Sequence, residues 1–329
     1  MADEDFGLDK APEGAHGGGQ AAGHVSVLLK EAIDFLAIRR GGTYIDATLG
    51  LGGHSLEIAR RLGPQGHLIG LDKDTNALEL ARKRLSQMEG ERPRITLLHS
   101  SYADVASHVP AATADGLLAD LGVSSLQFSD PARGFSFQAE GPLDMRMDPQ
   151  GERTADQVVN HMGEKDLANV IYEFGEERRS RRIARAIVRA RPVRTTAHLA
   201  QVISAALRSM NKGRKAHQIH PATLTFQAIR IFVNRELDDL KALMEAAPGV
   251  LRPGGRLVVI SFHSLEDRIV KDALREGARS GIYSVLTRKP VGAAEEEIGR
   301  NPRSRSAKLR AAERTKISVS QKPKRLEKR

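Results

Sequence analysis

The segment DATLGLGGHS, residues 46–55, is the sequence feature that most constrains the fold. It joins a short apolar run, TYIDAT, to a stretch with helical spacing that ends at Gly63, with Pro64 beyond it as a stop. Three further strand candidates follow, GHLIGLD, RITLLHS and DGLLADLG, with the helix candidate NALELARKRLSQM between the first two. Strand and helix alternate, which predicts an α/β fold with an open parallel sheet and helices on both faces.

The alternation breaks in the middle of the chain. From about Gln127 to His217 the segments are helical, arginine-rich or loop-like. The pattern then resumes with one long amphipathic helix over HPATLTFQAIRIFVNRELDDLKALMEAA and a fifth strand in PGGRLVVISFHS, and IYSVLT and SAKLRAAERT form a candidate antiparallel pair. We therefore predict a discontinuous α/β domain, residues 24–127 and 218–314, interrupted by a helical domain over residues 128–217.

The glycine turn carries information about its ligand. A dinucleotide-binding fingerprint would have a third glycine at position 55, where this chain has Ser55. Asp46 adds a carboxylate close to the floor of the turn, which would repel a pyrophosphate but suits a sulfonium. Asp72 closes the second strand, where a carboxylate can accept hydrogen bonds from both hydroxyls of a ribose. A positively charged nucleoside without phosphate describes S-adenosylmethionine.

Composition excludes several classes of protein. The 329 residues contain no cysteine, so disulfides and thiolate metal sites are absent. No apolar run approaches the ~20 residues of a membrane helix. The acidic, glycine-rich segment 1–23 lacks the apolar core of a secretory signal and is interpreted as a disordered leader. We expect a cytoplasmic protein without membrane contact.

The positive charge is concentrated in two places. Residues 300–329 hold twelve Lys or Arg and two Glu, so the net charge of +10 lies in this C-terminal stretch, of which residues 315–329 form a basic tail. The segment RRSRRIARAIVRARPVR, residues 178–194, holds eight arginines and no acid. Ile183, Ile187 and Val188 recur at helical spacing, so one face can pack while the arginines point outward. Either cluster is a solvated surface or a phosphate-contacting one, and arginine without lysine favours phosphate contact.

Several ordered blocks resemble the MraW/RsmH family of bacterial methyltransferases over residues 24 to about 314. The most specific are YIDATLGLGGHS, RGFSFQAEGPLDMRMD, HPATLTFQAIRIFVNREL and GGRLVVISFHSLEDRIVK. The resemblance implies a class I, Rossmann-like methyltransferase domain with an inserted helical domain for RNA recognition. It also implies an enzyme that transfers a methyl group from S-adenosyl-L-methionine to the exocyclic N4 of a cytosine in the decoding region of 16S ribosomal RNA, within the small ribosomal subunit.

The same resemblance implies a cofactor site. Gly52, Gly53 and His54 would line the methionine end, and Asp72 would hold the ribose. The remaining contacts would come from Tyr102, which stands where the family usually has Phe and would flank the adenine, and from Asp120 and Gln127.

The chemistry at the target amine is less determined by the sequence. A cytosine N4 lone pair is delocalised into the ring, so positioning and a hydrogen-bond acceptor are needed. Asp120 ends the fourth strand without the Pro-Pro-aromatic element of many amino-methyltransferases. The residues leave open whether Asp120 accepts from N4, from the cofactor, or from both. We predict that SFHSLED or RGFSF supplies the missing wall, and that His263 accepts the released proton or orients the amine.

Other interpretations are weighed against this one. Methyl transfer from a sulfonium needs no metal, and we expect Asp144, Asp148, Glu266 and Asp267 to form salt bridges with Arg146 and Arg268 rather than a metal site. The alternatives are a DNA cytosine-N4 methyltransferase, a non-catalytic RNA-binding or assembly factor and a nicotinamide dehydrogenase. The sequence leaves open whether the chain forms a homodimer.

Overall fold

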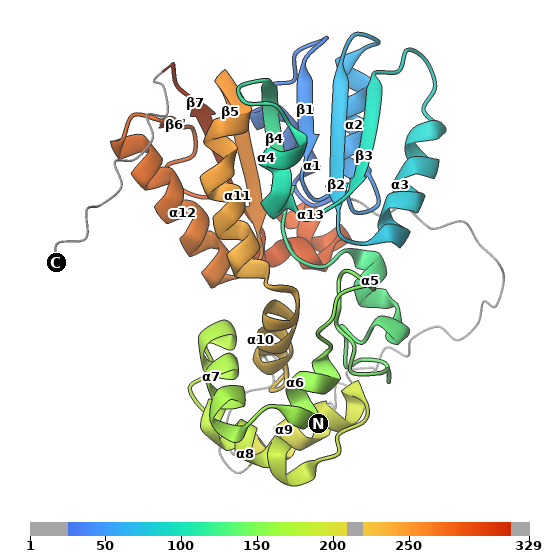
Figure 1. Ribbon diagram of the computed structural model, residues 1–329, viewed down its shortest axis with the longest axis vertical. Helices are drawn as coiled ribbons and strands as arrows, with labels where there is room; N and C mark the ends of the chain where they lie inside the picture. The colour runs from blue at the N-terminus through green and yellow to red at the C-terminus, as the bar shows by residue number, and fades with distance from the viewer. Residues whose placement is uncertain (1–25, 209–219, 317–329) are drawn as a thin grey trace, which may run out of the picture.

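The computed structural model describes residues 26–208 and 220–316, which form an upper α/β body and a lower helical body (Figure 1). The leader 1–23 and most of the basic tail 315–329 lie outside the described residues. So does the segment 209–217 at the end of the predicted helical domain.

A seven-stranded sheet organises the upper body, with strand order β3-β2-β1-β4-β5-β7-β6. Its first five strands are parallel and β7 is antiparallel to both of its neighbours. The strands are β1 (Thr43–Asp46), β2 (His67–Asp72), β3 (Arg94–His99), β4 (Ala114–Asp120), β5 (Leu251–Ser261), β6 (Tyr283–Val285) and β7 (Lys308–Arg314). The α/β class, the five parallel strands and the antiparallel pair at the end of the chain are confirmed.

Helices cover both faces of this sheet because alternate strand residues are apolar on each side. One face packs against α4 (Val105–His108), α11 (Glu236–Val250) and α12 (Ser264–Arg279). The other packs against α1 (Leu29–Leu36), α2 (Gly53–Leu62) and α3 (Thr75–Ser86). Burial of β4 on both faces makes it a near-continuous apolar run, which is why DGLLADLG reads as a strand without alternation.

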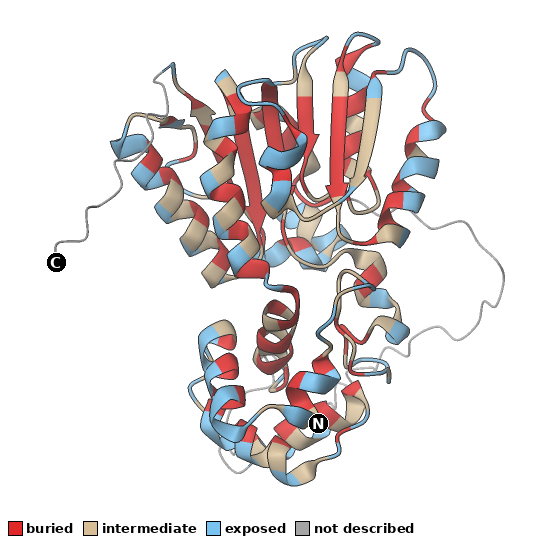
Figure 2. Cartoon of the chain, viewed as in Figure 1, coloured by how far each residue is buried: buried red, intermediate tan, exposed pale blue. Residues whose placement is uncertain are grey.

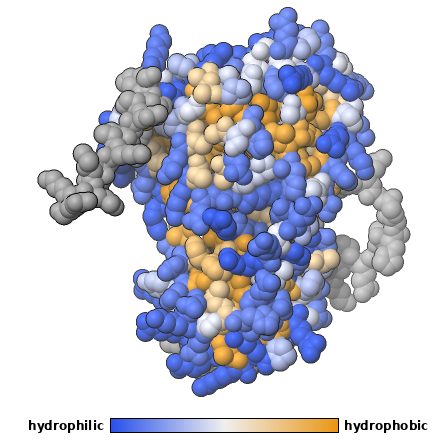
Figure 3. Space-filling model, viewed as in Figure 1, coloured by the Kyte–Doolittle hydropathy of each residue, from blue (hydrophilic) through white to orange (hydrophobic). Residues whose placement is uncertain are grey.

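The lower body has a core of its own. The helices α6 (Ala155–His161), α7 (Glu164–Gly175), α8 (Ser180–Ala190), α9 (Thr196–Leu207) and α10 (Thr223–Asn234) surround it. Apolar residues gather in both bodies on the visible face, and a hydrophilic band separates them where the bodies meet (Figure 3). Two cores separated in this way are what a domain inserted into another domain requires.

The return from the helical body to the sheet differs from the sequence expectation. One long helix was predicted over residues 220–247, but Arg235 has φ 54°, in the left-handed region, and separates α10 from α11. Apolar spacing continues across the break, so periodicity conceals it. Phe226, Ile229 and Val233 of α10 belong to the helical core, and α10 is buried on most of its surface (Figure 2). We therefore propose that the chain re-enters the α/β domain near residue 235 rather than 218.

The two bodies are joined by hydrogen bonds at that break. Within the helical body, the Asn234 side chain donates to the backbone oxygen of Met145 at 2.8 Å and accepts from the backbone N–H of Met147 at 2.7 Å, which fixes the end of α10. Lys73, directly after β2, donates to the backbone oxygen of Asn234 at 3.2 Å and pairs with Asp239 of α11. The end of α10 is thus held against the carboxyl ends of the strands, which positions everything that faces the space between the bodies.

Candidate active site

A cavity of about 1190 Å³ lies at the carboxyl ends of the parallel strands, next to the helical body. Its walls come from the glycine turn, from the residues that follow β2, β3, β4 and β5, and from segments 126–147, 227–236 and 301–306. In open α/β sheets this edge is where ligands bind. We call the part near the glycine turn and Asp72 the cofactor half, and the part near Arg230 and His263 the target half.

The glycine turn forms the floor of the cofactor half. Gly50 and Gly52 have φ of 50° and 73°, a conformation that only glycine adopts without strain. A Cβ on Gly52 would lie 3.2 Å from Cβ of Ala81 in α3, and one on Gly53 would lie 2.0 Å from Oγ of Ser26. Gly53 lines the cavity together with Gly50 and Leu51, whereas Gly52 is not among the lining residues. Close packing against α3 and Ser26 is therefore sufficient to explain why residues 52 and 53 are glycines, without the approach of a ligand.

Asp72 is fixed at the rim of the cofactor half. Its Oδ2 accepts a hydrogen bond from the backbone N–H of Gly50 at 2.7 Å, and its Oδ1 accepts from that of Asp74 at 2.8 Å. Burial raises the pKa of this carboxyl to about 6, while the two backbone hydrogen bonds oppose the shift. Each carboxylate oxygen has a second lone pair for a ligand, so the residue is oriented before any ligand arrives.

Asp46 ends β1 beside the glycine turn, as predicted, but its side chain is buried behind the turn. It is 1% exposed, does not line the cavity, and accepts a hydrogen bond from Oγ of Ser55 at 2.7 Å. Burial raises its pKa to about 6. Ser55 therefore stands at the third-glycine position because its hydroxyl satisfies a buried carboxylate behind the turn. Asp46 does not touch the cavity, but its charge raises the pKa of both Asp72 and Asp120, so its attraction for a positively charged ligand stays a prediction.

Tyr102 and Gln127 both line the cavity, with their polar atoms already engaged by the protein. Tyr102 donates its hydroxyl to the backbone oxygen of Glu236 at 3.3 Å, which leaves the ring as its contribution to the wall. Gln127 is buried, and its Nε2 donates to Oδ2 of Asp74 at 2.9 Å. The same oxygen of Asp74 receives Nη1 of Arg133 at 2.7 Å. Gln127 thus ties the loop after β4 to the end of β2.

Asp120 ends β4 at the centre of the cavity. Its Oδ1 is buried and has no hydrogen-bond partner among residues 26–208 and 220–316. Burial, reinforced by the charges of Asp46, Glu266 and Glu297, raises its pKa well above the ordinary aspartate value. An unpartnered buried carboxyl oxygen is costly, so its retention at a cavity wall points to a ligand that donates to it.

His54 stands beside this carboxyl. Its Nδ1 lies 3.8 Å from Oδ2 of Asp120, and its Nε2 lies 3.1 Å from the backbone oxygen of Val27. The carbonyl can only accept, so Nε2 carries a proton there. The ring is thereby held in the wall between the glycine turn and Asp120.

His263 follows β5 and caps the first turn of α12. Its Nδ1 accepts from the backbone N–H of Glu266 at 3.4 Å, while Oε2 of Glu266 accepts from the backbone N–H of Phe262 at 2.8 Å. A neutral ring with Nδ1 as acceptor carries its proton on Nε2. That Nε2 is buried, lies 3.2 Å from Oε1 of Glu266 and completes no hydrogen bond within the described residues. The ring therefore offers a donor to the cavity.

The strongest feature of the target half was missed in the sequence. Arg230 of α10 lines the cavity, and its Nε and Nη2 donate to the two carboxylate oxygens of Glu236, each at 2.9 Å. The side chains of Arg230 and Glu236 are 18% and 6% exposed. The signal was present as one arginine in an otherwise apolar helical face, followed six residues later by a glutamate.

Two further walls come from segments that are far apart in the sequence. The guanidinium of Arg303 lies over the ring of Phe128 at 4.4 Å, and both residues line the cavity. Phe262 and Ser136 also line it, from the two segments SFHSLED and RGFSF that were expected to supply the missing wall. Phe128 and Phe262 thus add aromatic surface to the cavity.

The acidic segments form ion pairs, but not all with the expected partners. Asp144 pairs with Arg146 at 2.7 Å as expected, and Arg146 lowers the pKa of that carboxyl against the opposing effect of burial. Asp267 pairs with Arg310 at 2.6 Å, while Arg268 pairs instead with Glu176 of the helical body at 2.9 Å. Within the described residues, no group of three His, Asp or Glu side chains is arranged to hold a metal ion. No helix of that part is long and apolar enough to cross a membrane.

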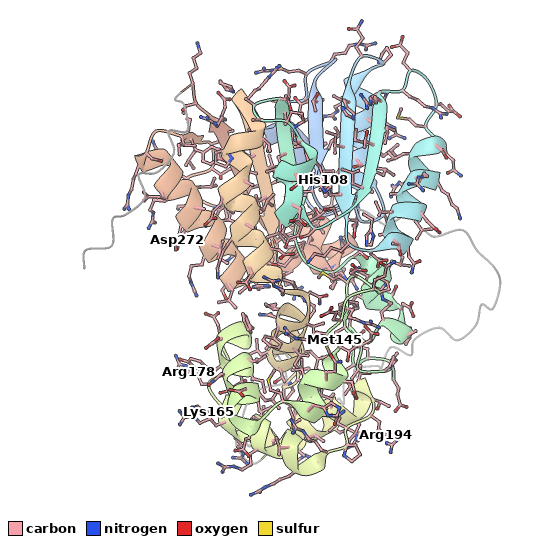
Figure 4. The ribbon with its side chains drawn as sticks, in the orientation of Figure 1. His108, Met145, Lys165, Arg178, Arg194 and Asp272 are labelled. Carbon is pink, nitrogen blue, oxygen red and sulfur yellow. The ribbon has the colours of Figure 1, made fainter. Side chains whose placement is uncertain are left out.

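The internal arginine cluster is a surface feature of the helical body. Ile183 and Ile187 of α8 are fully buried, so the arginines of the same helix face outward. They line a groove of about 510 Å³, which we call the arginine groove (Arg181, Arg182, Arg185, Ala186, Arg189 and Ala206). Arg178 and Arg194, at the two ends of the cluster, project from opposite sides of the lower body (Figure 4).

Comparison with known proteins places the chain among methylases. The model of the MraW methylase family matches residues 21–315. A protein of Koribacter versatilis, named ribosomal RNA small subunit methyltransferase H, is 69% identical over 310 residues, which cover 93% of this chain and 98% of the relative. Proteins with the same name from Acidobacterium capsulatum and Solibacter usitatus are 63% and 51% identical, over 88% of this chain and 98% and 99% of their own lengths.

Proposed function

Because the chain belongs to the MraW methylase family, we propose that it transfers a methyl group from S-adenosyl-L-methionine to the exocyclic N4 of a cytosine in the decoding region of 16S ribosomal RNA. The small-subunit target comes from the names of its relatives, and the N4 position from the resemblance of its sequence blocks. The observation that carries the proposal is the buried, unpartnered Oδ1 of Asp120, which faces the same cavity as Asp72 and the glycine turn.

The cofactor half has the donors and acceptors that S-adenosylmethionine needs. Asp72 supplies two oriented carboxylate oxygens for the ribose hydroxyls, and the ring of Tyr102 supplies an apolar surface for the adenine. Gly53 and His54 line the turn on which the methionine end would lie. When bound, the cofactor supplies a methyl group already activated by the positive sulfonium.

Asp120 is the residue we assign to the target amine. Its Oδ1 accepts a hydrogen bond from the exocyclic N–H₂, which orients the nitrogen lone pair and directs it toward the methyl donor. A positive charge bound nearby lowers the pKa of Asp120, so the carboxylate form is favoured when the site is loaded. The proton lost by the methylated amine then has an acceptor within reach. His263 orients the base as a donor through Nε2, since its Nδ1 is occupied by the cap of α12.

The helical body is assigned to RNA binding. A target base must leave its stack to enter a cavity between two bodies. The arginine groove lies on the body that is inserted between β4 and β5, and arginines fixed on a helix bind phosphates with directed hydrogen bonds. A small-subunit substrate also implies that the protein works in the cytoplasm.

One assay tests the proposal against its alternatives. Labelled methyl transfer from S-adenosylmethionine is measured with small ribosomal subunits, free ribosomal RNA and DNA, followed by nucleoside analysis. We expect label in N4-methylcytidine from the small subunit. Label in DNA alone would favour a DNA cytosine-N4 methyltransferase, and no label in any substrate would favour a non-catalytic RNA-binding factor. Sedimentation of the purified chain decides between a monomer and a homodimer.

A further inference from the structure

The target half of the cavity holds a guanidinium that the proposed reaction does not yet use. Glu236 binds Nε and Nη2 of Arg230 side-on, which fixes the plane of the guanidinium. The hydrogen bonds to Glu236 use Nε and Nη2, so Nη1 is the nitrogen on the other side of the guanidinium, and Arg230 lines the cavity. The free edge of a fixed guanidinium therefore faces a space large enough for a nucleoside.

The pairing with Glu236 determines what that edge can recognise. The carboxylate is 6% exposed and neutralises most of the positive charge, so the pair is a poor general attractor of phosphate. What remains is the directional donation of N–H groups, which suits neutral acceptors such as ring nitrogens and carbonyl oxygens. His263 adds a second donor through the buried Nε2 described above.

Three groups thus face one cavity with a defined polarity. Asp120 offers an acceptor, and His263 and Arg230 each offer a donor. The Watson–Crick edge of cytosine presents the complement, with N4 as a donor and N3 and O2 as acceptors. Uracil presents O4 as an acceptor and N3–H as a donor. At these two of the three positions it would place acceptor against acceptor and donor against donor.

We propose, on the premise of the proposed function, that Arg230 is a specificity-determining residue that donates through Nη1 to N3 of the flipped cytosine, with His263 donating to O2 and Asp120 accepting from N4. The wall then imitates the Watson–Crick edge of guanine, with one acceptor beside two donors. Discrimination follows because a base with the wrong pattern leaves buried polar groups without partners.

The experiment resembles a double-mutant cycle, in which one partner is a residue of the protein and the other is a single atom of the base. Small subunits are prepared with cytidine or 3-deazacytidine at the target position, and kcat/KM is measured with the wild type and with Arg230→Lys. Lysine keeps the charge opposite Glu236 but loses the planar edge. Arg310→Lys is the matched control, since Arg310 forms a similarly buried pair with Asp267 that does not line the cavity.

We expect the wild type and Arg310→Lys to lose at least about 10-fold in kcat/KM with 3-deazacytidine, in the range expected when a directed hydrogen bond is removed. For Arg230→Lys we expect a loss of less than 3-fold, with affinity for S-adenosylmethionine within 3-fold of the wild type. Because each penalty compares two bases on one protein, the different reactivity of the analogue cancels.

The outcomes separate this inference from the function on which it rests. An equal penalty in the wild type and in Arg230→Lys overturns the role of Arg230 while leaving the methyltransferase intact. Affinity for S-adenosylmethionine lowered 10-fold or more, with the base penalty unchanged, assigns Arg230 to the cofactor instead. No methylation of cytidine subunits by the wild type overturns the proposed function itself. If Arg230→Lys does not fold, Glu236→Gln, which loosens the guanidinium, takes its place and should shrink the penalty at least 3-fold.

Discussion

The two halves of the cavity are built in different ways. The cofactor half is made by backbone and carboxylate groups of successive strand–turn–helix units, so that Asp72 binds Gly50 only 22 residues away. The target half is made by side chains from α10, the start of α12 and the segment before β7, brought together only by the fold. Residues close together in the sequence can form a site for a cofactor. The site for one base of a large RNA is formed here by residues that are far apart in the sequence.

Asp120 lies where the halves meet, and its replacement is expected to have the largest effect. Asp120→Asn keeps the shape but replaces one acceptor oxygen and removes the charge, so kcat should fall by about 10²- to 10³-fold. The affinity for S-adenosylmethionine, measured by calorimetry, should stay within about 3-fold if the residue serves the target amine.

A second readout comes from pH. The acid limb of the kcat/KM profile should be present in the wild type and absent in Asp120→Asn, because the raised pKa of Asp120 in the free enzyme governs it. If kcat of Asp120→Asn remained within 3-fold of the wild type, the acceptor role would be ruled out and the boundary between the halves would have to be redrawn.

Asp72 tests the cofactor half alone. Asp72→Ala removes the oxygens that face the cavity, and affinity for S-adenosylmethionine should fall by about 10- to 100-fold, the usual range for removal of a charged hydrogen bond. Asp72→Asn keeps one acceptor and should lose less. At saturating cofactor, kcat should change little with either variant. Unaltered affinity in both variants would contradict the assignment of the ribose to Asp72.

The sequence predicted one half of this site better than the other for a physical reason. The glycine turn and Asp72 could be placed because the carboxyl ends of parallel strands follow from local patterns, whereas His54 came from the family resemblance alone. Arg230 could not be placed, since its partner Glu236 lies beyond a break at Arg235 that helical periodicity conceals. Arg303 and Phe128 are in contact although they are 175 residues apart, and neither segment has a sequence pattern that predicts this contact.

For Asp46 the position in the fold was predicted correctly, but the partner of its side chain was not. The end of β1 was correctly placed, but the direction of one side chain depends on which neighbour satisfies it, and Ser55 does so behind the turn. The identity of residue 55 was therefore correctly interpreted as unlike a dinucleotide site. Its structural reason is the buried carboxylate.

The pH dependence of stability checks that position. The folded pKa of Asp46 is raised to about 6, so the folded state binds the proton more tightly than the unfolded state and this contribution to stability falls as pH rises. Relative to Asp46→Asn, the wild type should lose about 1.4 kcal/mol of unfolding free energy between pH 5 and pH 7.5, on the order of one pKa unit. Urea denaturation at several pH values measures the difference.

Asp144 provides the control for Asp46, because its pKa is shifted in the opposite direction. Burial would raise the pKa of Asp144, but the hydrogen bonds and charge of Arg146 outweigh burial and lower it. Its contribution is lost only as pH falls below the unfolded aspartate value, so the difference between the wild type and Asp144→Asn should be flat between pH 5 and pH 7.5. A flat difference for Asp46→Asn as well would show that Asp46 is not held in a protonation-favouring site.

The smallest expected effect concerns the arginine groove, which we assign to RNA binding. Arg181→Gln with Arg189→Gln removes two charges from the arginine groove, and binding of small subunits should weaken about 3- to 10-fold near physiological salt. The slope of log affinity against log salt should fall by roughly 2, because each arginine neutralises about one phosphate of the RNA. Arg60→Gln with Arg61→Gln, the same charge change on α2 of the upper body, should leave both quantities unaltered. Equal weakening by the two double variants would mean that RNA affinity depends only on the net charge of the protein. The helical body would then not be the specific RNA-binding surface.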